Sequence, residues 1–131
     1  MTAYVSAPLG GADVGGGKAL CRQVREAVGD GFEEGDLRVE VTCLDAGDGE
    51  GGWTLAQVGA NARRATEDSA AIAFIGEPAA ARRQSRPIVE AAGIAELGGL
   101  GRRQAIATIL AVSEEGGQSD PRQAVLDAVE G

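Results

Sequence analysis

The sequence of 131 residues predicts a single α/β domain over residues 1–131, built on a doubly wound parallel sheet. The run from Ala70 to Pro78 is apolar without polar alternation and stops at a Gly and a Pro, which is typical of a strand buried on both faces. Amphipathic helical patterns precede this run, from Thr54 to Asp68, and follow it, from Ala79 to Ala92. A helix between successive buried strands is the usual connection in a parallel sheet.

The first part of the chain supplies a strand, a helix and a second strand. Ala3 to Ala7 is a short strand that ends in the turn cluster Pro8 to Gly11. A helix is expected from Lys18 to Val28, with an apolar face made of Leu20, Cys21, Val24, Ala27 and Val28. Apolar and polar residues alternate from Leu37 to Leu44, which predicts a half-exposed strand at the edge of the sheet.

The middle of the chain continues the alternation of helices and strands. Trp53 is expected to open the second helix, whose inner face would consist of Leu55, Val58, Ala62 and Ala65. After the central strand, Gly93 closes the third helix, and Ile94 to Leu97 forms a brief fourth strand. The next four positions, Gly98 to Gly101, predict a flexible break.

Two consecutive helices follow that break. The first runs from Arg102 to Glu115, with Ile106, Ile109, Leu110 and Ser113 along one face. Asp120 and Pro121 suit the cap and first position of a last helix, from Arg122 to Val129. The predicted fold is therefore a three-layer, flavodoxin-like sheet of about four strands in the order 2-1-3-4, followed by two helices.

The chain contains no histidine, which excludes Ser-His-Asp catalysis, the usual zinc sites and histidine pH switches. Its two cysteines, Cys21 and Cys43, do not form a metal-binding motif, so no metal site is expected. Both cysteines fall on faces that should point inward. We expect a pair of buried thiols, with a disulfide as the alternative.

The formal net charge of −8 argues against nucleic acid as a partner, because nucleic-acid binding needs a basic surface. No apolar run approaches the ~20 residues of a membrane-spanning helix, so no membrane insertion is expected. The chain enters its first predicted strand directly from Met1, so we expect no signal peptide in it.

The stretch from Gly10 to Lys18 lies between a strand and a helix, as a P-loop does, but it departs from that motif. The motif requires Gly at position 12 and Ser or Thr at position 19, where this chain has Ala12 and Ala19 and so lacks the hydroxyl that binds Mg²⁺. The dinucleotide pattern G-x-G-x-x-G is also absent in the correct spacing, although Asp45 would suit a ribose hydroxyl. We therefore expect no cofactor and no enzymatic activity.

Acidic residues follow two of the predicted strands. Asp45 and Asp48 share one Gly-rich loop, where acidic pairs are usually solvated turn formers. Glu77 stands alone at the tip of the central strand, where it has either a structural role or a role in binding the amine of a ligand. Ligands of doubly wound folds bind beyond the carboxyl ends of the strands, so the loop from Gly76 to Pro78 belongs to the expected site.

With these residues in place, the chain resembles the amino-terminal lobe of type I periplasmic binding proteins, the branched-chain amino-acid receptor group of ABC importers. The order and spacing of six segments support the resemblance: Tyr4–Gly11, Gly51–Ala56, Ala60–Ala65, Ala73–Gly76, Arg86–Ile88 and Ala91–Ile94. The tail, through Ala105–Leu110, Glu115–Gly117 and Asp120–Val129, is similar to the helices with which that family returns to its first lobe. The resemblance implies a lobe over residues 1–97, a Gly-rich linker at 98–101 in place of the second lobe, and returning helices at 102–131.

The resemblance implies a non-enzymatic, extracytoplasmic protein that binds an amino acid or a similar small solute weakly and presents it to an ABC permease. The binding residues that it implies follow the strands: Ser6, Pro8, Leu9, Gly10, Gly76, Glu77, Pro78 and Leu97. The alternative is an interaction module without a ligand, in which the face left by the missing lobe pairs two copies as a homodimer. An enzyme on a flavodoxin-like scaffold has only fold analogy behind it.

Overall fold

A computed structural model describes residues 2–10, 17–29, 40–48, 52–77, 79–115 and 121–130. Strands and helices alternate up to the fourth strand, as the sequence predicts. The elements are β1 (Thr2–Ala7), α1 (Gly17–Gly29), β2 (Glu40–Asp45), α2 (Leu55–Glu67), β3 (Ala71–Gly76), α3 (Ala79–Ala91), β4 (Ala95–Glu96), the 3₁₀ helix η1 (Gly98–Leu100), α4 (Arg102–Glu115) and α5 (Pro121–Glu130).

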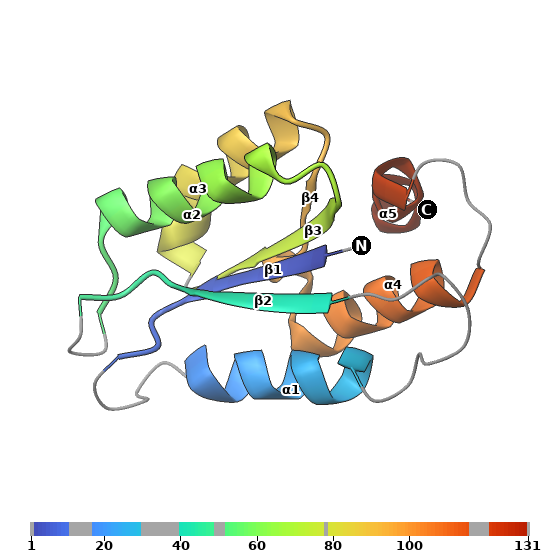
Figure 1. Cartoon of the computed structure of the whole chain (residues 1–131), viewed down its shortest axis with the longest axis horizontal. Coiled ribbons are helices and arrows are strands. Elements are labelled where there is room, and N and C mark those ends of the chain that lie inside the picture. Colours follow the sequence, from blue (N-terminus) through green and yellow to red (C-terminus); the bar gives the residue numbers. More distant parts are fainter. Residues whose placement is uncertain are drawn as a thin grey trace.

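The sheet has four strands in the order β2-β1-β3-β4, and every neighbouring pair is parallel. Figure 1 shows α2 and α3 on one face of this sheet and α1 and α4 on the other, which makes three layers. The predicted α/β class, strand order and closing pair of helices are confirmed. None of the helices in the described ranges is long and apolar enough to cross a membrane.

Each face of the sheet has its own hydrophobic core. Side chains of β1 alternate between the two, since Val5 packs with Leu20 of α1 and Ile109 of α4, while Tyr4 packs with Ala62 of α2 and Val89 of α3. All six residues of β1 and all six of β3 are buried, which explains why the run at 71–76 lacks polar alternation. Strand β2 lies at the edge and is half-exposed, as predicted.

Helix α2 packs on the sheet through Val58, Ala62 and Ala65, as the sequence predicts, but not through Leu55. Leu55 is 62% exposed, whereas Gly59 and Asn61 are buried beside the expected Val58. The helix begins at Leu55, with the Thr54 hydroxyl accepting from the Gln57 amide at 3.1 Å, so Leu55 lies in the first turn, before the helix reaches the core at Val58. The predicted inner position of Leu55 is wrong.

Trp53 also lies outside the helix that it was expected to open. It forms an isolated antiparallel bridge with Gly47, and its ring packs against Ala46, Val58 and Ala81. The predicted packing of Trp53 at the start of α2 is confirmed, although its backbone belongs to the preceding loop.

Cys21 and Cys43 form a disulfide, so the expected pair of buried thiols is wrong. Cys21 lies on α1 and Cys43 on the neighbouring edge strand β2, with their Cα atoms 6.1 Å apart. That separation lies within the range a disulfide spans without backbone movement. The two cysteines do point inward as predicted, but toward each other, so the bridge joins α1 to the edge of the sheet.

The two closing helices are fixed to the sheet by apolar and polar contacts. Ala105 and Ile109 of α4 and Val125 of α5 belong to the core cluster on the α1 face. In the first turn of α5, Arg122 donates to three main-chain carbonyls, with distances of 2.6 Å to Ala71 O, 2.8 Å to Asp68 O and 3.2 Å to Ala92 O. The expected cap Asp120 lies outside the described residues.

The stretch at 98–101 is not the flexible break that its glycines predict. Residues Gly98–Leu100 form a turn of 3₁₀ helix, and Gly98 is buried. The amide of Gly101 donates back to Gly98 O at 3.3 Å, and Gly101 adopts the positive φ of 85° that favours glycine. The segment is thus a packed turn between β4 and α4.

Candidate functional site

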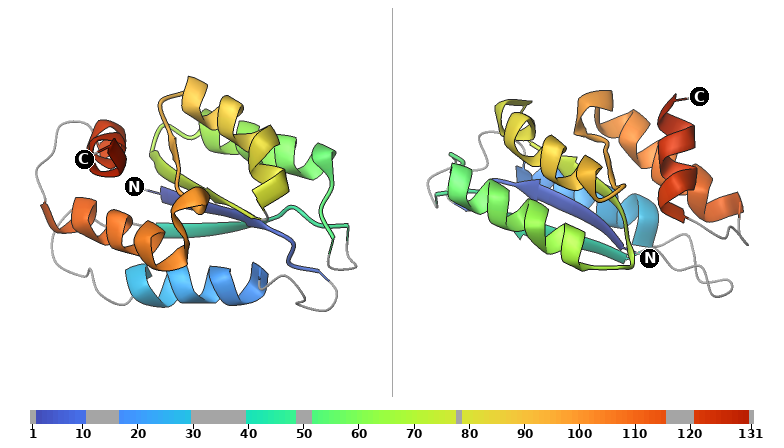
Figure 2. Two further views of the ribbon diagram at one scale, coloured as in Figure 1. Left: turned by 180° about the vertical axis from the view of Figure 1, so that it is seen from behind. Right: turned by 90° about the horizontal axis from the view of Figure 1, so that it is seen from above.

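The order in which strands are added to the sheet changes direction between β1 and β3, which is where doubly wound sheets bind ligands. Strand β1 leads to α1 on one face, and its neighbour β3 leads to α3 on the other (Figure 2). Ser6 and Gly76 are paired at the carboxyl ends of these strands, and the Glu77 amide donates to Ser6 O at 2.9 Å. The structure therefore brings together Ser6, Gly76 and Glu77, three of the residues predicted to bind a ligand.

The hydroxyl of Ser6 is held by the protein itself. Ser6 is only 2% exposed, and its Oγ accepts from Asn61 Nδ2 of α2 at 3.0 Å. The same Asn61 nitrogen donates to Asp45 O at 3.1 Å and so links β1, β2 and α2 at this edge. Sequence reasoning missed Asn61, although a polar residue between Val58 and Ala62 on the inner helix face was a signal that could have identified it.

The loop after β1 is organised by Asp45 of the adjacent strand. Its Oδ1 accepts from the Leu9 amide at 3.0 Å and from the Gly47 amide at 2.8 Å. In the loop after β2, Asp48 Oδ1 accepts from the Gly52 amide at 3.2 Å. Both acids thus act as turn formers, as predicted. The expected site residues Pro8, Leu9 and Gly10 are half-buried beside this loop.

A buried carboxylate lies at the carboxyl ends of β3 and β4. Glu96 is 4% exposed and accepts from the amides of Gly76 at 2.8 Å and Gly98 at 2.9 Å, and from the Ser85 hydroxyl at 3.2 Å. Burial raises the pKa of Glu96, and the hydrogen bonds from the two amides and from Ser85, with the nearby Arg82, partly oppose that rise. Glu96 thus connects β3, α3 and η1 at this edge.

Sequence reasoning missed Glu96 as well. An acid inside the apolar run from Ile94 to Leu97 was its signal. Leu97 itself is fully buried in the core on the α1 face, so its side chain is not exposed at the carboxyl edge of the sheet. Pro78, another expected site residue, lies outside the described residues.

Opposite charges flank Gly76 at the end of the central strand. Glu77 follows it in the chain and is half-buried. Arg82, also half-buried in the first turns of α3, donates from Nη1 to Gly76 O at 3.1 Å. A carboxylate and a guanidinium at one strand end can bind an ammonium and a carboxylate respectively. Within the described ranges, no group of three or more His, Cys, Asp and Glu side chains is arranged to bind a metal.

Comparison with known proteins adds nothing to the geometry of the carboxyl edge as evidence for the function of this chain. No family model, no curated protein and no solved structure matches this chain.

Proposed function

We propose that this domain binds a small zwitterionic solute, such as an amino acid, at the carboxyl edge of its sheet without transforming it. The observation that supports the proposal is the pair of opposite charges, Glu77 and Arg82, beside Gly76 at the β1–β3 reversal. The resemblance to one lobe of the type I periplasmic binding proteins favours the same edge and the same class of ligand.

Each charged group has a complementary part of the solute to bind. One N–H of the Arg82 guanidinium is used on Gly76 O, and a guanidinium has five N–H donors, so donors remain for a solute carboxylate. The carboxylate of Glu77 accepts from the ammonium group. Well-formed pockets bury about 70–90% of a small ligand. A single lobe covers the solute from one side only, so its affinity for the solute is weak.

The test is a titration of the isotopically labelled protein with single amino acids, followed by NMR of the backbone amides. We expect shifts at Ser6, Gly76 and Glu77 for at least one amino acid. Glu77→Gln keeps the shape of the side chain and removes its charge, and should weaken binding by roughly tenfold, the usual effect of one charged hydrogen bond. Glu67→Gln, on the exposed side of α2, is the matched control and should bind as the wild type does.

The variants must keep the fold for this comparison to be informative. Melting temperatures without ligand should therefore agree among the wild type and both variants. Equal affinity of Glu77→Gln and Glu67→Gln, or an absence of shifts at the carboxyl edge with every amino acid, would contradict the proposal.

Two exposed apolar side chains favour self-association as a second candidate function. Leu55, 62% exposed, lies in the connection that leaves the carboxyl end of β2, and Leu100, 38% exposed, lies in the connection that leaves β4. Both therefore belong to the edge that a second lobe would cover in the family that the chain resembles. Sedimentation at several protein concentrations tests this candidate: a dimer that Leu55→Ser dissociates would support it, and a monomer throughout would exclude it.

A further inference from the structure

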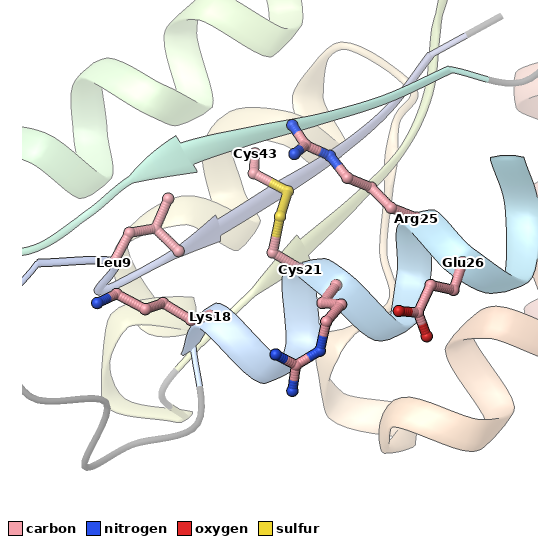
Figure 3. Close-up of a pocket in the computed structure, with 7 residues that line it drawn as sticks. Leu9, Lys18, Cys21, Arg25, Glu26 and Cys43 are labelled. Carbon is pink, nitrogen blue, oxygen red and sulfur yellow. A yellow bond between two sulfur atoms is a disulfide. The ribbon is translucent and has the colours of Figure 1, made fainter.

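A cavity of about 580 Å³, widely open to solvent, lies between α1 and the edge strand β2, outside the proposed solute site. Figure 3 shows its walls: one side of α1, the Cys21–Cys43 disulfide and Leu9 from the loop after β1. A volume of this size lies in the ordinary range for small-molecule sites.

Three cationic side chains line the cavity from one stripe of α1. Lys18, Arg22 and Arg25 are spaced at i, i+4 and i+7, which places them along the same side of the helix, and all three are exposed. In Figure 3 Lys18 extends toward Leu9, and Arg25 extends from α1 toward β2. Within the described part of the chain, neither arginine of the stripe is in an ion pair.

The charge of this wall is opposite to that of the molecule. The chain has 20 acidic and 12 basic residues, a formal net charge of −8. The cavity is lined by the three cations and a single acid, Glu26, which leaves a local excess of two positive charges. A positive concave surface on an acidic protein concentrates anions at that place and leaves the rest of the surface repulsive to them.

The remaining wall is apolar and fixed. The disulfide joins α1 to β2 and holds the helix at the sheet edge, and both of its cysteines line the cavity together with Leu9. A ligand that fits these walls carries an anionic group for the cations and an apolar body for the disulfide and the leucine. The cations lie on a helix rather than a loop, so the backbone positions of the three residues are fixed before any ligand arrives.

From this arrangement we propose that the α1–β2 cavity is a binding site for a small organic anion, a carboxylate or phosphate group attached to an apolar body. This site is distinct from the solute site at the carboxyl edge of the sheet. The residues that line the cavity and the residues expected to bind a ligand at that edge share only Leu9, which supplies apolar surface to the cavity.

The experiment is an NMR titration of the oxidised, labelled protein with four probes. Phenyl phosphate and benzoate carry both parts of the ligand, inorganic phosphate carries only the anion, and benzyl alcohol carries only the apolar body. We expect phenyl phosphate or benzoate to shift amides of α1 and β2, inorganic phosphate to bind more weakly, and benzyl alcohol to leave the spectrum unchanged. Which of the first two binds more tightly identifies the preferred anionic group.

A pair of matched double variants tests the role of the cations. Arg22→Gln with Arg25→Gln removes two charges from the cavity, and the expected loss of affinity is at least roughly tenfold. Arg83→Gln with Arg103→Gln removes two charges from exposed positions on α3 and α4 and should bind as the wild type does. Urea midpoints of both variants establish that each is folded.

Three results would overturn the proposal. The first is equal loss of affinity in the two double variants, which would indicate a general charge effect. The second is binding of benzyl alcohol as tight as that of phenyl phosphate. The third is that the shifts caused by the anions fall outside α1 and β2.

Discussion

Substitution of Gly98 by alanine tests whether the turn between β4 and α4 is a packed part of the domain. A Cβ on Gly98 would overlap the carbonyl oxygen of Gly76 and would lie 2.8 Å from Arg82 Cδ and 3.0 Å from Glu96 Oε1. The carbonyl belongs to the central strand, and the carboxylate is held by three hydrogen bonds. Neither can move away without loss of its own contacts.

The expected cost follows from these contacts. Overpacking of a buried site costs about 1–3 kcal/mol, and a strained bond from the Gly98 amide to Glu96 adds about 1.5–3 kcal/mol. The smaller entropy of an alanine in the unfolded chain returns about 0.4–1 kcal/mol. The net loss of unfolding free energy is therefore about 3 kcal/mol, which for a domain of 131 residues lowers the melting temperature by about 10 °C.

Gly99→Ala is the control, because its Cβ would meet only the end of the exposed Arg86 side chain, with Nη2 at 3.3 Å. This variant should remain within about 0.5 kcal/mol of the wild type. Urea unfolding, monitored by circular dichroism, measures both variants under the same conditions. Equal midpoints for Gly98→Ala and Gly99→Ala would refute the argument and would restore the expectation that positions 98–101 are a tolerant junction.

Three further predictions concern contacts that join distant parts of the chain. Arg122→Ala should lower the unfolding free energy by about 3 kcal/mol, because three bonds from a charged donor are lost; equal stability in urea would contradict this. Burial and the bond to Asp68 raise the pKa of Tyr4 to about 12. The stabilisation that this shift gives is therefore complete below pH ~10 and is lost as the pH rises toward 12. Tyr4→Phe should flatten that part of the stability–pH curve, and an unchanged curve would count against this explanation. Reduction of the bond between Cys21 and Cys43, 22 positions apart, should cost about 3 kcal/mol in the wild type and nothing in the double serine variant; an unchanged urea midpoint in the reduced wild type would disprove this.

Periodicity and turn residues were sufficient to predict the elements, and the known topology of doubly wound folds supplied the layers and the strand order. The central strand was evident because both of its faces are buried, and α4 was predicted with its observed ends. The burial of Leu55 was predicted wrongly because it depends on where α2 begins over the sheet. The state of Cys21 and Cys43 was predicted wrongly because it depends on the distance between α1 and β2. Local patterns show which side of an element is apolar and say little about what lies opposite it.

The candidate site was predicted less completely for a related reason. Asn61 reaches a partner 55 positions away, at Ser6, and Glu96 reaches one 20 positions away, at Gly76. Each was visible as a polar residue in apolar surroundings, but the partner became known only from the fold. The cationic stripe on α1 was likewise readable at helical spacing, whereas the cavity beside it exists only because β2 lies across from it.

The three bonds of Arg122 have a consequence for how this protein can change through evolution. All three acceptors are main-chain carbonyls, which every amino acid possesses. Substitution at Ala71 or Ala92 therefore leaves the acceptor chemistry intact, so no compensating change at position 122 is required. Correlated substitutions among relatives would therefore not reveal this contact, although it fixes the last helix to the sheet. An arginine retained while the residues that it contacts vary is the pattern to expect.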